Sequence, residues 1–167
     1  ERHFDVGPSL FSIPAQQVVA ALDELRLAEG TDPAESVPLA RGLLAQNQPE
    51  IQWSRATLDA AAARVFATAG LVEESLNVLE TLSRRLDRIP AWDVNNVRTT
   101  CDAAHTLWAL DRTDHIDVIE RNVREKVVGP DFRYPMFDGR LALARLCAVS
   151  GRFAEASDWF AKSRAVL

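Results

Sequence analysis

Cys101 and His105 are the residues of this sequence whose types and spacing best suit metal binding. They are four positions apart, which places both side chains on one face of a helix, where they could bind the same ion. A tetrahedral site needs a second pair of such ligands, and the sequence contains none. We therefore interpret Cys101 and His105 as packing residues, and we expect neither a metal nor a cofactor.

A second polar cluster surrounds the expected start of a helix near residue 114. A calcium-binding loop there would need a glycine and a bidentate glutamate at fixed positions, and this segment lacks them. Carboxylates in the first turn of a helix also complement the helix dipole, and we interpret the cluster in this way. Its members are Asp111, Asp114, His115 and Asp117.

The sequence contains no motif of the common enzyme classes. GxSxG would indicate a nucleophilic serine, GxxxxGK[ST] a phosphate-binding loop, HExxH a zinc protease and GxGxxG a dinucleotide site, and none of the four occurs. We therefore expect a protein that is not an enzyme.

The elements that position these residues repeat along the chain. Gly30, Gly70, Leu110-Asp111 and Gly151 each interrupt a helical pattern, and they recur at intervals of about 40 residues. A period of this length predicts helical hairpins stacked end to end, because no single hairpin can bury its own apolar face. We expect four antiparallel hairpins, with helices over residues 14–28 and 33–46, 57–69 and 71–89, 96–110 and 114–128, and 139–150 and 152–167.

Local signals support several of these bounds. Asp32 followed by Pro33 and Glu35 predicts a helix start with a capping box. Pro38 predicts either a kink or a postponement of the regular helix to Leu39. The clearest apolar stripe of the chain predicts the core, and it consists of Leu76, Leu79, Leu82 and Leu86.

Composition limits the domain organisation and the partners. The chain is 47% hydrophobic, which suffices for one substantial core, and its net charge of −5 is unlike that of a nucleic-acid-binding domain. No apolar run approaches the roughly 20 residues that span a bilayer, and Cys101 and Cys147 are expected to be reduced thiols. We expect a cytoplasmic protein with an N-terminal extension at 1–13 and a single helical-repeat domain at 14–167. Because residue 1 is glutamate, we expect a piece of a longer chain.

The last hairpin resembles the tetratricopeptide repeat. The residues that carry the resemblance are Leu143-Ala144, Cys147, Gly151, Phe153, Ala156 and Phe160. A weaker copy contains Ala62-Ala63, Phe66, Gly70, Val72, Ser75 and Leu79, with serine where the pattern has alanine. The resemblance implies an all-α fold, a tetratricopeptide-like α-solenoid of about four hairpins.

The longer period is similar to that of the helical sensor regions in large bacterial signalling ATPases. The segments 110–115, 131–135 and 139–146 resemble the distal part of LuxR-type regulators of the maltose-activator class and of ATPase-linked adenylate cyclases. This resemblance implies a protein-interaction or regulatory module of a bacterial signalling or transcription-regulatory protein. Its partner would be a protein, a peptide or a neighbouring domain, without direct contact to nucleic acid or membrane. The alternative is an array that senses a small effector, which would enclose a pocket lined by aromatic residues.

The positions of two arginines indicate where such a partner would bind. Counting six residues back from each break gives Glu24, Arg64, Ala104 and Arg145, and an offset of one residue replaces Ala104 by His105. We hypothesise that Arg64, His105 and Arg145 form a ladder that binds a carboxylate-bearing peptide. Alternatively, the arginines are solvated or pair with the nearby acids Asp59, Asp102 or Asp138.

The last helix ends without a glycine, a proline or a polar cap. Its stripe leaves an apolar face that a stacked array has to cover, so either further helices follow or the face meets a partner, including a second copy in a homodimer. The stripe contains Phe153, Ala156, Phe160, Ser163 and Leu167. We interpret the four tryptophans, Trp53, Trp92, Trp108 and Trp159, as core or inter-repeat wedges instead of ligand platforms. Trp92 is the exception to watch, because residues 90–93 read as a loop between repeats.

Overall fold

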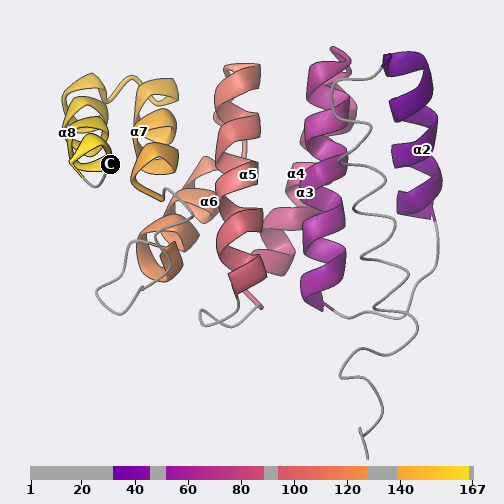
Figure 1. Cartoon of the computed structure of the whole chain (residues 1–167), viewed down its shortest axis with the longest axis horizontal. Helices are drawn as coiled ribbons and strands as arrows, with labels where there is room; N and C mark the ends of the chain where they lie inside the picture. The colour runs from indigo at the N-terminus through magenta and orange to yellow at the C-terminus, as the bar shows by residue number, and fades with distance from the viewer. Residues whose placement is uncertain (1–31, 46–51, 89–93, 128–138, 166–167) are drawn as a thin grey trace, which may run out of the picture.

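The computed structural model describes residues 32–45, 52–88, 94–127 and 139–165, and this part of the chain is entirely helical (Figure 1). The all-α class expected from the sequence is thereby confirmed, and none of the helices described is long and apolar enough to cross a membrane. The expected helix over 14–28, the break at Gly30 and Trp92 lie outside the described residues. The elements are α2 (Pro33–Ala45), α3 (Gln52–Thr68), α4 (Val72–Leu86), α5 (Val94–Leu110), α6 (Ile116–Asn122), the π-helical segment η1 (Val123–Val127), α7 (Gly139–Val149) and α8 (Phe153–Arg164).

The helices α2, α3, α5, α7 and α8 stand in a row (Figure 1). Each packs against its neighbour in that row, and α4 packs mainly against α3. Among the described elements, the backbone of α2 lies close only to that of α3 and the backbone of α8 only to that of α7, while side chains of α2 also reach α4 and side chains of α8 reach η1. The contacts therefore join elements that are close in sequence instead of gathering all helices around one centre.

Three helices of this row end in the same left-handed turn. Gly70 follows α3 with φ 74°, Asp111 follows α5 with φ 53° and Gly151 follows α7 with φ 73°. Glycine reaches this region without steric cost, and aspartate is one of the few other residues found there. The sequence left the third break open between Leu110 and Asp111, and the structure places it at Asp111. The closing backbone bonds run from Leu71 N to Phe66 O, from Arg112 N to Leu107 O and from Arg152 N to Cys147 O.

The pairs α3–α4 and α7–α8 share the details of their turns. Leu71 and Arg152, which precede α4 and α8, have nearly the same backbone angles, with φ −86° in both and ψ 67° and 61°. Ser75 occupies the position of Ala156, and its buried hydroxyl donates to the carbonyl oxygen of Ala63 at 2.7 Å. This hydrogen bond explains why a serine is accepted where the tetratricopeptide pattern has alanine.

The predicted leucine stripe of α4 forms part of the main core. Leu79, Leu82 and Leu86 are fully buried, and Leu76 is nearly so. They belong to one cluster with residues of α3, α5, α6 and α7, among them Ala63, Ala103, Leu107, Ile119 and Leu143. A second cluster joins α2 to α3 through Val37, Ala40, Leu43, Leu58 and Phe66.

Two helices differ from the expectation. The capping by Asp32 is confirmed, since its Oδ1 accepts from the backbone N–H of Ala34 at 2.9 Å. However, α2 runs on from Pro33 through the exposed Pro38, so the regular helix is not postponed to Leu39. The donor that Pro38 lacks belongs to the solvent side of α2, where the unmatched carbonyl can reach water.

The return helix of the third hairpin is not the continuous helix expected over 114–128. His115 takes a left-handed conformation with φ 56°, α6 begins at Ile116, and the helix widens to η1 at Val123. The change follows Asn122, whose side-chain amide donates both to the carbonyl of Val118 and to Asp87, which follows α4. A side chain that bonds the carbonyls of its own helix is a known cause of such local distortions.

Candidate binding groove

Three large apolar residues are exposed in the described part of the chain, and all three line one groove. Trp108 is 46% exposed, Phe153 73% and Phe160 50%. The groove measures about 470 Å³ and is open to solvent. Its lining combines Trp108 of α5 with Leu141, Ala144, Arg145 and Ala148 of α7 and with Phe153, Ala156, Ser157 and Phe160 of α8.

Helical periodicity brings these side chains together. On α7 and on α8 the lining residues follow one another at spacings of three, one and three positions, which places them along a single helix face. Ala144, Ala148 and Ala156 have short side chains, so the facing stripes leave room between them. Phe153 and Phe160 border this space on the side of α8.

Arg145 is the one charged residue of the lining. Its guanidinium carbon lies 4.6 Å from the centroid of the Trp108 ring, a cation–π contact between α5 and α7. Stacking uses the flat face of the guanidinium, while its N–H donors point outward in the plane of the group. Within the described residues, no carboxylate forms an ion pair with Arg145. The groove is therefore an apolar surface with a cationic hydrogen-bond donor at one side.

The three residues of the predicted ladder lie on consecutive helices of the row. Because the turn is at Asp111, His105 and not the buried Ala104 holds the position that matches Arg64 and Arg145. Arg64 of α3 pairs with Asp102 of α5, with Nη1 and Oδ1 3.2 Å apart. This pair is one that the alternative hypothesis names, and the ladder as a peptide site stays a prediction.

The other chemical candidates occupy structural positions. Cys101 is a buried free thiol in the core of α5. Asp114 accepts two hydrogen bonds from Arg112, and these bonds hold the pKa of its carboxyl below the ordinary value. Trp159 is half-buried against the main core, as expected for a wedge, whereas Trp108 is 46% exposed and contacts Arg145 between α5 and α7, so it is not a core residue.

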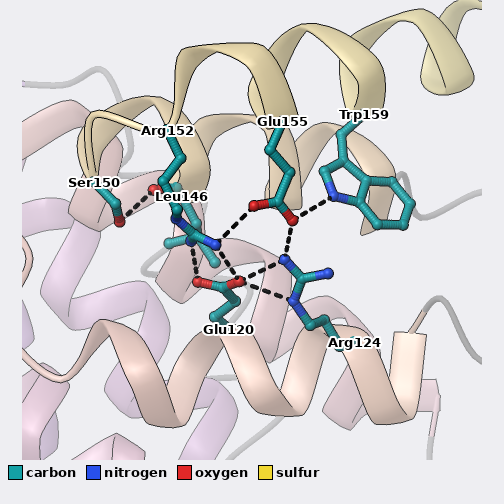
Figure 2. A network of polar contacts seen from close by, with 7 residues as sticks. All are labelled: Glu120, Arg124, Leu146, Ser150, Arg152, Glu155 and Trp159. Atoms are coloured by element: carbon teal, nitrogen blue, oxygen red, sulfur yellow. Dashed lines mark hydrogen bonds and ion pairs between the residues drawn. The ribbon is translucent and has the colours of Figure 1, made fainter.

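A network of charges joins α6 and η1 to α8 (Figure 2). Glu120 of α6 lies between Arg124 of η1 and Arg152 at the start of α8, and it accepts from both guanidiniums. Glu155 accepts from the same two arginines and from the indole N–H of Trp159. Carboxylates and guanidiniums thus alternate around a closed ring.

Electrostatics assigns this ring a structural role. Burial alone would raise the pKa of Glu120, but hydrogen bonds from Arg152 and Arg124 outweigh it, so the pKa lies below the ordinary value. Burial raises the pKa of the Cys147 thiol. Ligand atoms of Glu120, Cys147 and Glu155 come within 4.8 Å of one another, as in a metal site. A cation there would have to displace two guanidiniums and deprotonate a buried thiol, so the ring is better suited to clamping α8 onto η1.

Comparison of the chain with protein-family models, with curated proteins and with solved structures finds no match.

Sequence reasoning found the groove only in part. The stripe containing Phe153 and Phe160 was visible as an apolar face without a cover, and Arg145 was picked out by its place before the turn. Trp108 was not, although a signal existed, because Ala67 and Ala148 hold its position relative to the other two turns. A large aromatic residue where both counterparts are alanine indicates a local specialisation of the surface.

Proposed function

We propose that this chain is a tetratricopeptide-like α-solenoid of about four hairpins that acts as a non-enzymatic protein-interaction module. The recurrent left-handed turns at Gly70, Asp111 and Gly151 support a repeated unit. The restriction of helix contacts to neighbouring elements supports a stacked arrangement. The first hairpin of this array includes residues outside the described part.

The observation that carries the interaction function is the groove of α5, α7 and α8. Exposed aromatic residues that gather at one place, next to an arginine, are the composition of a protein-binding surface. The groove is open to solvent, which suits a segment of polypeptide better than an enclosed small molecule. The partner would be a protein, a peptide or a neighbouring domain of a longer bacterial regulatory protein in the cytoplasm.

A small-effector sensor is the second candidate. A volume of about 470 Å³ with aromatic walls lies within the range of small-molecule sites. A ligand of this kind would stack on Trp108 and Phe160 and would need a further element to cover it.

Selection of random peptides displayed on phage tests the function. We expect peptides to be enriched on the chain and lost on the double variant Phe153→Ser/Phe160→Ser, which changes only exposed side chains. A Thr81→Ser variant on the outer face of α4 serves as the control and should retain the peptides. Circular dichroism checks that all three proteins fold alike.

The opposite outcomes are equally definite. If no peptide is enriched but a panel of small aromatic and sugar-like compounds raises the melting temperature of the chain, the sensor function replaces the proposal. If neither peptides nor compounds bind, the groove has neither function.

A further inference from the structure

The helices α3 and α4 form a surface equivalent to that of α7 and α8, and α5 covers it. Counted from Gly70 and Gly151, Leu79 of α4 holds the position of Phe160 of α8, and Leu76 holds that of Ser157. Leu79 is fully buried in a cluster with Ala103, Ala104 and Leu107 of α5, whereas Phe160 is 50% exposed. The difference is that α5 lies over α3 and α4, while no described helix lies over α7 and α8 in the same way.

In the covered counterpart, the covering helix carries a carboxylate that pairs with an arginine below it. Arg64 and Arg145 occupy matching positions before their turns, and the carboxylate that pairs with Arg64 is Asp102 on the covering helix. The pair is partly shielded, since the Arg64 side chain is 40% exposed and that of Asp102 18%. A covering helix on α7 and α8 would bring its own residue at this position close to Arg145.

The middle repeat supports the link between the two charges. There the position of Arg64 is taken by His105, and on α7, which packs over α5, the position of Asp102 is taken by the buried Ala142. The repeat whose covering helix has no carboxylate at this place therefore also has no arginine below it.

We propose that the groove of α5, α7 and α8 binds an amphipathic helix of a partner protein, which presents small apolar side chains to the groove and one carboxylate to Arg145. The inference rests on the proposed interaction function and specifies the partner for the same groove. The helix adds to the row as α5 adds to α3 and α4, with its carboxylate in the place of Asp102. Charge complementarity points to a partner protein, because a second copy docked through the same groove would bring the same lining, which contains no carboxylate.

A helical peptide library provides the probe. Its template is the sequence of α5, 17 residues long, stapled on the solvent face, with the apolar contact positions and position 102 randomised. We expect selection on the chain to enrich Asp or Glu at position 102. In the best selected peptide, Asn at this position should raise the dissociation constant about tenfold, because a charge-assisted hydrogen bond to Arg145 is lost.

Charge reversal separates this pairing from general attraction. On Arg145→Glu, the Lys version of the peptide should bind better than the Asp version, the reverse of the order on the native chain. Arg84→Glu makes the same charge reversal at an exposed site on α4 outside the groove. On this control variant the Asp peptide should still bind better than the Lys peptide.

Each other result overturns the inference and leaves the interaction function to be judged separately. Helices that bind without an acidic preference, or equally well to Arg145→Glu, would retain the interaction function and remove the acidic partner. Enrichment of random peptides on phage together with failure of every helical peptide would do the same. Sedimentation that shows a dimer abolished by Phe160→Ser would replace the partner with a second copy.

Discussion

At the scale of the residue, Asp59 has the most strongly shifted pKa among the described residues. Its side chain is 2% exposed and lies between two guanidiniums, 3.4 Å from Arg55 Nε and 3.0 Å from Arg85 Nε. Arg55 also donates to the backbone carbonyl of Leu44, so this carboxylate connects α2, α3 and α4. A buried charge in such a position contributes only while its partners remain.

Removing the Asp59 carboxylate should destabilise the fold. We expect Asp59→Ala to lower the free energy of unfolding by about 3 kcal/mol, because two partly buried guanidiniums lose the anion between them. Asp59→Asn should cost less, since the amide oxygen still accepts a hydrogen bond. Urea unfolding measures both, with Asp158→Ala on the exposed side of α8 as a control that changes the stability by less than about 0.5 kcal/mol. Equal losses for Asp59→Ala and the control would refute the assignment.

The same residue predicts a pH dependence of stability. Burial raises the pKa of Asp59 from 3.8 to about 6, despite the opposing effect of Arg55 and Arg85. The folded state therefore binds this proton more tightly than the unfolded state. The resulting contribution is fully present below pH 3.8 and is lost as the pH rises to about 6, with an upper magnitude of about 3 kcal/mol.

Asp59→Asn tests this sign, because it removes the titration. The difference in unfolding free energy between the native chain and Asp59→Asn should shift against the native chain from pH 4 to pH 7. The carboxylates of Glu120 and Glu155 act in the opposite sense, since their pKa values are lowered and their contribution is lost as the pH falls. A difference that stays constant over this range would show that Asp59 titrates normally.

At the scale of the element, the turns were the most predictable feature. Gly70 and Gly151 were placed correctly, because a glycine between two apolar helical patterns is a strong helix stop. The third turn could be narrowed only to Leu110-Asp111, since neither residue is a glycine. The change from α6 to η1 had no sequence signal, because it follows a side-chain bond from Asn122 to Asp87, 35 residues away in the sequence.

Replacing two glycines by alanine should change the stability of the fold in opposite directions. Gly70 has φ 74°, so Gly70→Ala forces a side chain into a left-handed conformation and should lower the stability by about 1 kcal/mol. Gly42 lies inside α2, and an added Cβ there meets no atom within 4 Å. Gly42→Ala should therefore raise the stability by about 0.5–1 kcal/mol. Thermal unfolding of the two variants beside the native chain decides the matter, and shifts of the same sign would contradict it.

At the scale of the whole molecule, the sequence predicted the core better than the polar connections between distant helices. The leucines of α4 were identified because they recur on one helix face. The ring of Glu120, Arg124, Arg152 and Glu155 was not, because its members come from elements more than 30 residues apart and no periodic pattern marks them. Charged side chains occur all along such helices, and only the packing of the helices decides which of them meet.

Matched truncations on the two hairpins test the contrast between the covered and the open face. Leu79→Ala should cost about 2–5 kcal/mol, because it leaves a cavity in the main core. Phe160→Ala holds the same position on α8 and should cost less than about 1 kcal/mol, since this ring is half exposed. Urea unfolding at low and high protein concentration provides both values. Similar losses would mean that the face of α8 is covered in solution.

The two cysteines of this chain can report how often α8 detaches from α7. Cys147 is completely buried on α7, and burial suppresses its thiolate form, whereas Cys101 lies on α5, which packs against α7 but not against α8. Because α8 packs along α7 and is tied to α6 and η1 mainly by the charged ring, detachment of α8 is the shortest route by which a maleimide can reach Cys147. Alkylation followed by mass spectrometry should then label Cys147 before Cys101, and occupation of the neighbouring groove should delay the first event more than the second.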